Sequence, residues 1–359
     1  PPGNPRIPLP LWWGRVRVGV IKTGISRPFV PIPPHPAPLP PGEREFPDEN
    51  YLFVFQIVVI RDHARKGQER GSMISERVEY SPIVDRRPFK LPDQARVAVW
   101  VVVNVEVWDI RYPMPRTLLG GAGASVPDIP NYSWYDYGLR VGFWRMKAIL
   151  DKYKIKGTLS LNAASCEITP QIVEQCVQSD WEILGHGYVQ RVLSQEKDER
   201  EVIRRTIQII KDFTGKPPRG WMGPQLVETG NTPDILAEEG IEYVADWVND
   251  DEPYPLKVKK GSLIALPYTV ELNDIPIHLL FHEPSSGLYD RARAAFDTLY
   301  AEGKERSKIL TISTHPYVTG VAHRSGYYEK IFEYIKQHDG VLFMRGFEIL
   351  DWYKKFMKS

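Results

Sequence analysis

A chain of 359 residues, 42% of them hydrophobic, is long enough for one large domain with or without an appendage. Its 46 basic and 45 acidic residues leave a formal net charge of +1, which indicates neither a nucleic-acid nor a membrane-surface partner. The two cysteines, Cys166 and Cys176, are too few for a disulfide scaffold, and no run reaches the roughly 20 apolar residues of a membrane span. We expect a soluble, cytoplasmic homo-oligomer that acts on a small-molecule substrate and has no nucleic acid or membrane partner.

Residues 1–72 differ in composition from the rest of the chain. Thirteen of the 32 prolines fall within the first 41 residues, in runs that can form neither a helix nor a sheet ladder. We predict an extended or disordered leader, with Met73 as the natural start, because Gly71-Ser72 before it resembles a cloning scar. The alternative is a proline-rich docking arm. Residues 73–359 are predicted to form a single domain.

From Ala95 onward, strand and helix patterns alternate. Val97 to Val105 is a continuous β-branched run, which is typical of a strand buried on both faces of a parallel sheet. A loop rich in proline and glycine follows at 113–130. The strands are expected at 97–105, 158–161, 181–184, 219–222, 243–246, 263–266, 278–281, 309–312 and 341–343. The helices are expected at 139–153, 170–178, 196–213, 232–239, 289–302, 326–337 and 346–356.

Seven or eight such units over about 265 residues favour an α/β fold of the TIM-like (β/α) barrel type. An open doubly wound sheet is the competing architecture. No glycine-rich dinucleotide or P-loop signature follows any expected strand, and the sequence at 120–123 lacks both a preceding strand and the Lys-Ser/Thr pair. A nucleotide cofactor is therefore not expected.

Polar side chains follow most of the expected strands. In a barrel, residues at the carboxyl ends of the strands face the active site. Acids, amides and histidines recur at these points of successive units, which favours catalysis over chance. The residues concerned are Asn104, Glu106, Asn162, His186, Trp221, Asp246, His282 and His315.

This set of side chains suits hydrolysis at a carbonyl. Glu106 can take a proton from water, and His315 can protonate a leaving nitrogen. Asp246 can orient a histidine and raise its basicity. No Ser or Cys nucleophile motif is present, so water is the expected attacker. Each residue also has a structural interpretation, as a salt-bridge partner, a loop cap or a packed core residue.

The strand-end motifs resemble those of the polysaccharide deacetylase superfamily over roughly residues 96–353. The motifs are Asn104-Val105-Glu106-Val107, His186-Gly187-Tyr188-Val189-Gln190, Arg219, Asp246-Trp247 and Thr314-His315-Pro316. The resemblance implies a distorted barrel of the NodB-homology type. In the metal-dependent members an aspartate and a second histidine bind the metal, and here Val107 and Gln190 stand in those places. It follows that no cofactor is required; the alternative is one divalent metal such as zinc, held by Glu106, His186 and Gln190.

This altered pattern is similar to the branch of metal-independent allantoinases and bacterial cyclic imide hydrolases. That likeness implies a hydrolase that opens a small cyclic amide or imide, in which Glu106, His186, His315, Arg219 and Asp246 are catalytic. The residues expected to bind substrate are Asn104, Tyr137, Arg140, Asn162, Gln190, Trp221, Tyr268 and His282. The alternatives are deacetylation of an N-acetylated sugar and a barrel that binds a ligand or carbohydrate without catalysis.

Overall fold

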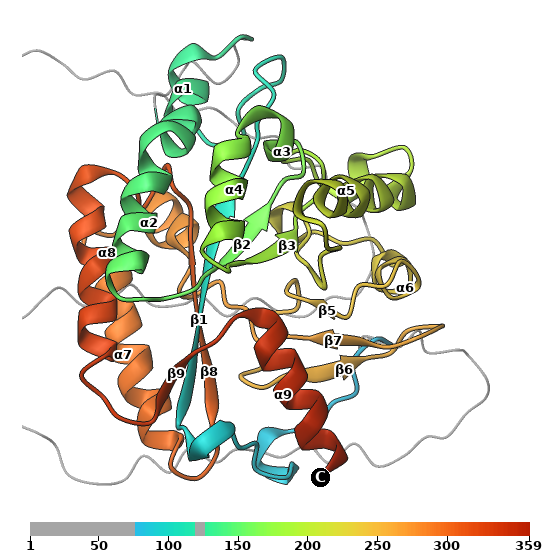
Figure 1. The fold of residues 1–359 in the computed structure, drawn as a ribbon, viewed down its shortest axis with the longest axis vertical. Helices are drawn as coiled ribbons and strands as arrows, with labels where there is room; N and C mark the ends of the chain where they lie inside the picture. The colour runs from blue at the N-terminus through green and yellow to red at the C-terminus, as the bar shows by residue number, and fades with distance from the viewer. Residues whose placement is uncertain (1–75, 119–125) are drawn as a thin grey trace, which may run out of the picture. The chain divides into compact units, whose positions relative to one another are not determined.

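The computed structural model describes residues 76–118 and 126–359, so the predicted leader at 1–72 lies outside the described residues. One curled sheet forms the centre of the fold (Figure 1). Its strands are β1 (Val97–Val105), β2 (Thr158–Leu161), β3 (Glu182–Gly185), β4 (Gly220–Trp221), β5 (Tyr243–Val244), β6 (Tyr254–Leu256), β7 (Leu263–Ala265), β8 (Lys308–Thr314) and β9 (Val341–Phe343).

The strand order is β6-β7-β5-β4-β3-β2-β1-β8, and β9 pairs with the beginning of β1. Every pair is parallel except β6 with β7. Neighbours along the chain are thus mostly neighbours in the sheet, as successive βα units require. This confirms the predicted α/β fold and its distorted barrel.

Helices pack around the sheet (Figure 1). They are α1 (Ile129–Tyr137), α2 (Phe143–Lys152), α3 (Ser165–Ile168), α4 (Pro170–Gln178), α5 (Glu199–Thr214), α6 (Thr232–Glu238), α7 (Gly287–Glu302), α8 (Ala322–Ile335) and α9 (Gly346–Lys358). Two π-helical turns, η4 (Gly138–Gly142) and η7 (Pro276–Leu280), add to these. Short 3-10 turns lie at η1 (Ile83–Asp85), η2 (Pro92–Gln94), η5 (Leu193–Gln195) and η6 (Pro224–Leu226).

The two faces of β1 belong to two different cores. Its odd-numbered valines, such as Val101, pack outward with residues of α2, α4, α7 and α8. Its even-numbered residues, such as Trp100, pack inward with residues of β3, β5, β7, β8 and α9. Because both faces are covered, the strand is apolar throughout rather than alternating. The same inner row continues past the end of the strand to Glu106.

Two predicted local structures are wrong. Residues 278–281 were expected to be a strand, but they fall in and after η7. Pro276 begins that turn; proline suits a first helical turn and has no N–H to give to a sheet. The loop expected at 113–130 ends in the first turn of α1, where the Asp128 side chain accepts a hydrogen bond from Asn131 N and caps the helix.

The sheet does not close through a continuous ladder, because β6 and β8 are its two ends. A single bridge pairs Asn273 with Ser313 of β8, and Ser313 N donates to Leu272 O at 3.0 Å. The Thr311 hydroxyl also donates to Pro267 O. These bonds hold segment 267–274 along β8, so that Asp274 lies beside His315.

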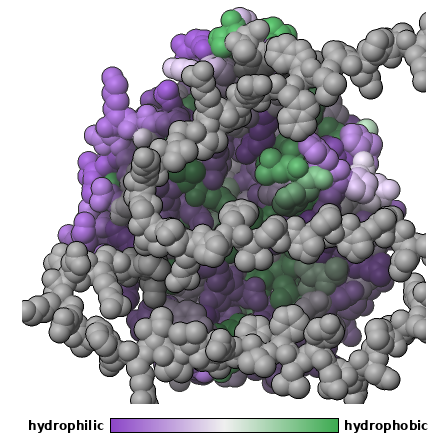
Figure 2. Space-filling model, turned by 180° about the vertical axis from the view of Figure 1, so that it is seen from behind, coloured by the Kyte–Doolittle hydropathy of each residue, from purple (hydrophilic) through white to green (hydrophobic). Residues whose placement is uncertain are grey.

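None of the helices in the described ranges is long and apolar enough to cross a membrane. On the face in Figure 2, the described surface is a mixture of hydrophilic areas and separate hydrophobic patches. Such mixed surfaces are usual for globular domains.

Gly220 is required where β4 passes β5. A Cβ at this position would lie 2.0 Å from Tyr243 Cζ, and the Tyr243 ring is itself fixed by a 2.7 Å hydrogen bond to Glu182. We expect Gly220→Ala to lower the free energy of unfolding by about 3 kcal/mol, because the interior cannot absorb the overlap. Gly326→Ala is the matched control, since no atom lies within 4 Å of its Cβ position in α8. It should raise stability by about 0.5–1 kcal/mol; equal urea midpoints for the two variants would contradict the packing described here.

Candidate active site

The interior rows of neighbouring strands converge at their carboxyl ends. Val102, Leu184 and Ile309 point into the interior of the barrel. Because side chains alternate between the two faces of a strand, residues an even number of positions after these also point inward. On β1 these are Asn104 and Glu106, on β3 His186, and on β8 Ser313 and His315. The structure thus brings Glu106, His186 and His315 together, as the sequence predicted.

The Glu106 carboxylate lies at the centre of the group and is buried. Gln190 Nε2 donates to its Oε1 at 2.8 Å. Its Oε2 accepts from Trp108 Nε1 at 3.2 Å and from the Tyr317 hydroxyl at 3.3 Å. His315 Nε2 lies 3.4 Å from Oε1. Burial raises the pKa of Glu106, but the positive charge of His315 is the largest opposing influence, and the pKa lies well below its ordinary value.

Asp274 fixes both the position and the charge of His315. Its Oδ1 lies 2.6 Å from His315 Nδ1, and its Oδ2 accepts from His315 N at 2.7 Å and from the Thr319 hydroxyl at 2.6 Å. Burial lowers the pKa of His315, but Asp274 and Glu106 together raise it to about 9. At neutral pH His315 is therefore an imidazolium with Nε2–H directed at Glu106.

His186 presents an acceptor to the same carboxylate. Its Nδ1 lies 2.7 Å from Met222 O, and since a carbonyl only accepts, Nδ1 carries the hydrogen. In the neutral ring Nε2 is then a lone pair, 3.9 Å from Glu106 Oε1 and without a hydrogen-bond partner in the described part of the chain. Two buried acceptors that face each other are satisfied by a molecule that donates to both, which a water can do.

Gln190 and Asn162 orient the carboxylate from behind. Asn162 Oδ1 accepts from Val107 N at 2.9 Å, and its Nδ2 donates to His186 O and, at 3.3 Å, to Gln190 Oε1. The Gln190 amide is thereby turned so that its NH₂ group meets Glu106. An NH₂ group has no lone pair for a metal, so Gln190 in this orientation is not a ligand.

The residues present do not fit a zinc centre. One imidazole and one carboxylate fall short of the three protein ligands of catalytic zinc sites, and Val107 offers no donor. Across residues 76–118 and 126–359, no group of three or more His, Cys, Asp or Glu side chains is arranged to hold a metal ion. The chemistry of the site is therefore derived from its own side chains.

The cluster opens into a pocket of about 240 Å³. Amide, imidazole and aromatic groups dominate its polar lining, and one guanidinium, that of Arg116, joins them. The lining residues are Asn104, Glu106, Arg116, His186, Gln190, Met222, Gln225, Leu226, Tyr268, Val270, Asn273, Ile275, Pro276, Leu280 and His315. Tyr268 and Asn104 thus lie where the sequence predicted them.

Trp221 and Asp246 follow strands as predicted, but they point away from the pocket. Trp221 is fully buried in the outer core against α5 and α6, and its neighbour Met222 faces the pocket instead. Ala245 points inward, so the next residue, Asp246, points outward. There both carboxylate oxygens of Asp246 accept hydrogen bonds from Gly223 N, at 2.8 and 3.0 Å. Burial, then the charge of Glu228, raises the pKa of Asp246. Asp246 contacts neither histidine of the site; the prediction that it orients one is wrong.

Arg219 also lies outside the site. It precedes β4, so it sits at the amino ends of the parallel strands rather than the carboxyl ends. There its guanidinium pairs with Glu242 and Asp351 and packs over Phe347. The prediction that it sets the charge state of the catalytic pair is wrong.

Three predicted substrate contacts are not brought to the pocket. The Tyr137 hydroxyl accepts from Arg145 Nη1 at 3.1 Å. Arg140 projects into solvent, with 76% of its side chain exposed, near Asp136. His282 is exposed and has a φ of 54°. The prediction placed His282 at the end of a strand expected at 278–281, but the structure has the turn η7 there. His282 therefore lies outside the barrel mouth.

Three residues of the site were not proposed as functional from the sequence: Asp274, Arg116 and Tyr317. Neither Asp274 nor Tyr317 follows directly on a strand of the sheet. The only signal in the sequence is their closeness along the chain to Tyr268 and His315, which were predicted to be functional. Arg116 lies in an irregular loop and had no sequence signal.

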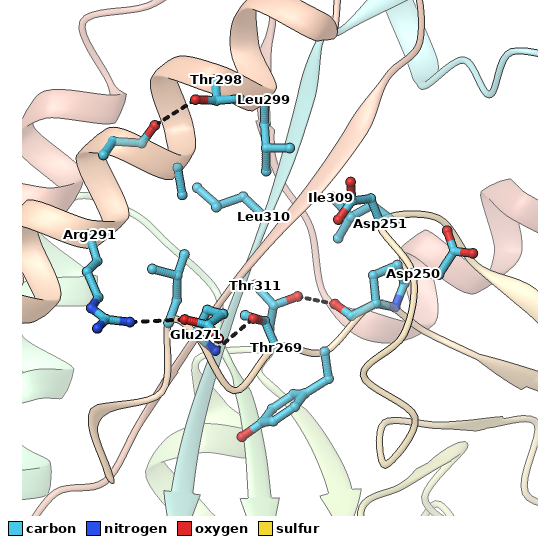
Figure 3. Close-up of a pocket in the computed structure, with 15 residues that line it drawn as sticks. Asp250, Asp251, Thr269, Glu271, Arg291, Thr298, Leu299, Ile309, Leu310 and Thr311 are labelled. Atoms are coloured by element: carbon cyan, nitrogen blue, oxygen red, sulfur yellow. Dashed lines mark hydrogen bonds and ion pairs between the residues drawn. The ribbon is translucent and has the colours of Figure 1, made fainter. Parts of the chain in front are cut away.

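A larger cavity of about 560 Å³ lies between α7 and β8 (Figure 3). Leu299, Ile309 and Leu310 give it apolar walls. Its arginine, Arg291, is neutralised by Glu271 and Glu283. It holds no histidine and no group comparable to the Glu106 cluster, so we place the candidate active site at the smaller pocket.

Comparisons with known proteins give one family. Residues 125–244 match the model of the family described as polysaccharide deacetylase. A Schizosaccharomyces pombe protein named as a polysaccharide deacetylase is 30% identical over 291 residues, which are 72% of this chain and 89% of that protein. These likenesses confirm the resemblance found in the sequence.

Two solved structures are similar over most of their length. A protein of Pseudomonas aeruginosa PAO1 named as a polysaccharide deacetylase is 27% identical with a TM-score of 0.67, covering 74% of this chain and 93% of that one. The structure of Puue allantoinase is also 27% identical, with a TM-score of 0.66, covering 77% of this chain and 98% of that one.

Asp274→Asn should lower the pKa of His315 from about 9, because it removes the largest charge that raises it. In the wild type, the raised pKa of His315 stabilises the folded state fully below a pH of about 6.5, the pKa of histidine in the unfolded chain, and this stabilisation is lost as the pH rises through about 9. The variant should lack this dependence of stability on pH. NMR titration of the histidine ring protons, assigned with His315→Asn, measures the shift. Asp246→Asn is the matched control, since Asp246 is buried but contacts no histidine of the site; a similar shift in both variants would contradict the assignment.

Proposed function

This chain belongs to the polysaccharide deacetylase family, and on that premise we propose that it hydrolyses a carbon–nitrogen bond of a small cyclic amide or imide with activated water. The observation that supports this is the pair formed by the Glu106 carboxylate and the His315 imidazolium, 3.4 Å apart in the wall of a small pocket. The reaction class follows from the family, and the ring substrate is our proposal.

The attack begins with a water held between two acceptors. The water donates one hydrogen to His186 Nε2 and the other to Glu106 Oε1, which leaves an oxygen lone pair for the carbonyl carbon of the substrate. Glu106 takes the proton as the new C–O bond forms. Gln190 keeps the carboxylate in place through its 2.8 Å hydrogen bond.

Collapse of the tetrahedral intermediate needs a proton on the leaving nitrogen. His315 Nε2–H supplies it as the C–N bond breaks, and Asp274 stabilises the imidazolium before that step. Once His315 is neutral, it no longer depresses the pKa of Glu106, so the two proton transfers favour each other. Glu106 then returns its proton to His315 across the 3.4 Å contact, and the ring has opened to an acid and an amide or amine.

The dimensions of the pocket favour a small ring. Its volume of about 240 Å³ has room for about eight waters at ~30 Å³ each, comparable with a five- or six-membered ring and one substituent. Asn104 Oδ1, which has no hydrogen-bond partner among the described residues, and the side-chain amide of Gln225 suit the N–H and C=O groups of such a ring. The likeness to an allantoinase structure supports the same substrate class.

Deacetylation of an N-acetylated sugar is the second candidate. A larger adjoining pocket of about 660 Å³ shares Gln190 and Gln225 with the first and is lined by Trp108, Tyr112 and Tyr188. Aromatic side chains suit the apolar faces of sugar rings, so this adjoining pocket favours the saccharide alternative. The name of the Schizosaccharomyces pombe relative favours it as well.

A panel of hydantoin, succinimide, dihydrouracil and allantoin beside chito-oligosaccharides separates the two candidates. We expect hydrolysis of at least one cyclic amide and none of the saccharides. Glu106→Gln should lower kcat by about 10²–10⁴-fold, because it removes the base but keeps the shape of the side chain. Binding of the ring, measured by calorimetry, should survive.

Glu167→Gln serves as the control for this variant, since Glu167 is exposed and its carboxylate contacts Tyr188 at 3.4 Å rather than the pocket. Deacetylation of the saccharides with no turnover of any ring would reject the proposal. Ring binding without turnover by the wild-type protein would instead favour a binding function.

Activity should not depend on a divalent metal, because the donor set around Glu106 falls short of a metal centre. We expect protein purified without added zinc to contain less than one metal per chain by elemental analysis. Incubation with a chelator should leave kcat/KM for the cyclic amide within about twofold. Loss of activity on chelation with recovery on adding zinc would contradict the proposal.

A further inference from the structure

Arg116 is a cation in the wall of the catalytic pocket whose charge no carboxylate pairs with. It lines the pocket together with Glu106 and His315. Within the described ranges it forms no ion pair, whereas Arg306 and Arg345, which are also partly buried, bind Glu252 and Glu348. Desolvating a guanidinium is unfavourable unless an anion meets it. The structure therefore leaves a charge at this position that an anion in the pocket would neutralise.

The charges around the pocket sum to a net positive value. Glu106 is negative, and His315 and Arg116 are positive at neutral pH. Burial lowers the pKa of Arg116, but Tyr317 and Glu106 more than offset this, so the guanidinium stays charged. Asp274 lies behind His315 and pairs with that imidazolium at 2.6 Å rather than with Arg116. Among the side chains that line the pocket itself, the positive charges therefore exceed the negative ones by one.

The position of Arg116 is fixed rather than incidental. The Tyr135 hydroxyl donates to Arg116 O at 3.2 Å, and the Tyr135 ring packs at a tilt against Tyr317 with their ring centres 4.4 Å apart. Tyr317 in turn donates to Glu106. The loop that carries Arg116 is thus tied to the catalytic carboxylate through two aromatic residues.

The other polar side chains of the lining are neutral or already used. Asn104 Nδ2 donates to Ser313 Oγ at 2.9 Å, and Asn273 Nδ2 donates to the Tyr268 hydroxyl at 3.1 Å. Amides suit an uncharged ring, while a guanidinium is the group that binds carboxylates through two parallel hydrogen bonds. Arg116 is therefore the element of this pocket that can distinguish a charged ring from a neutral one.

We propose that Arg116 is a specificity residue and that the natural substrate is a cyclic amide or imide bearing a carboxylate substituent. The inference rests on the proposed ring-opening function and narrows its substrate class. The carboxylate pairs with Arg116 while the scissile amide lies between Glu106 and His315. An uncharged ring of the same size leaves the guanidinium without an anion.

Matched pairs of substrates test this, because the members differ by one carboxylate. The pairs are dihydrouracil with its 6-carboxylate and hydantoin with its 5-acetate. In at least one pair, kcat/KM of the wild-type enzyme should be about tenfold or more higher for the charged member. Arg116→Gln should lower that ratio by about 10- to 100-fold, mainly through KM. Arg116→Lys should give an intermediate ratio, since it keeps the charge but loses the planar fork.

Arg111→Gln is the control, because Arg111 lies in the same region of chain but is exposed and pairs with Asp109. Its ratio should equal that of the wild type, and thermal unfolding should show that both glutamine variants are folded. A wild-type preference for the neutral rings, or an equal loss for both members in Arg116→Gln, overturns the inference. An equal loss for both members would mean that Arg116 stabilises Glu106 or the oxyanion of the tetrahedral intermediate and does not bind a carboxylate on the substrate.

If no member of either pair is hydrolysed, the proposed function fails, and binding tests the inference separately. The same four compounds are then titrated calorimetrically into the wild type and Arg116→Gln. Tighter binding of a charged member that is lost in the variant supports the role of Arg116. Equal affinities for charged and neutral members overturn it.

Discussion

The Glu106 carboxylate is a negative charge in the barrel interior, and the arrangement of the site depends on how that charge is balanced. A buried carboxylate without partners takes up a proton and ceases to be a base at neutral pH. Here four donors, from Gln190, Trp108, Tyr317 and His315, surround it. His315 can supply a full positive charge only because Asp274 supports it from the other side. The line of alternating charge from Asp274 through His315 to Glu106 thus keeps Glu106 deprotonated and His315 protonated at neutral pH.

The fold could be predicted from the sequence because its signals are local. The β-branched run at β1 and the alternation of strands and helices required no knowledge of distant contacts. The prediction failed where chain closure decided the structure. Residues 278–281 are apolar enough for a strand, but Pro276 and the bridge from Asn273 to Ser313 place them in a turn beside β8. That bridge joins residues 40 positions apart, a contact that periodicity alone does not indicate.

The candidate site could be predicted only in part, because strand ends were identified without the direction of each side chain. Glu106, His186 and His315 lie on inward rows and meet. Trp221 and Asp246 are one residue out of step and face the outer layer. Counting by twos from the interior core would have separated the two groups, but which face is interior depends on the packing of helices far away in sequence. Asp274 could not be found in this way, since it follows no strand and reaches His315 only through the closure of the barrel.

Val107 and Gln190 stand at the two positions that the family resemblance assigns to metal ligands, and the same scaffold can meet one electrostatic requirement in two ways. A divalent cation beside a carboxylate lowers its pKa and polarises water at once. In this chain, the His315 imidazole and the Gln190 amide contact the carboxylate, and His186 Nδ1 is held by Met222 O so that Nε2 faces the same carboxylate. The positive charge is smaller, and in the proposed mechanism the group that carries it also gives up its proton. The proposed base and acid would then share one proton reservoir across the 3.4 Å contact between Glu106 Oε1 and His315 Nε2.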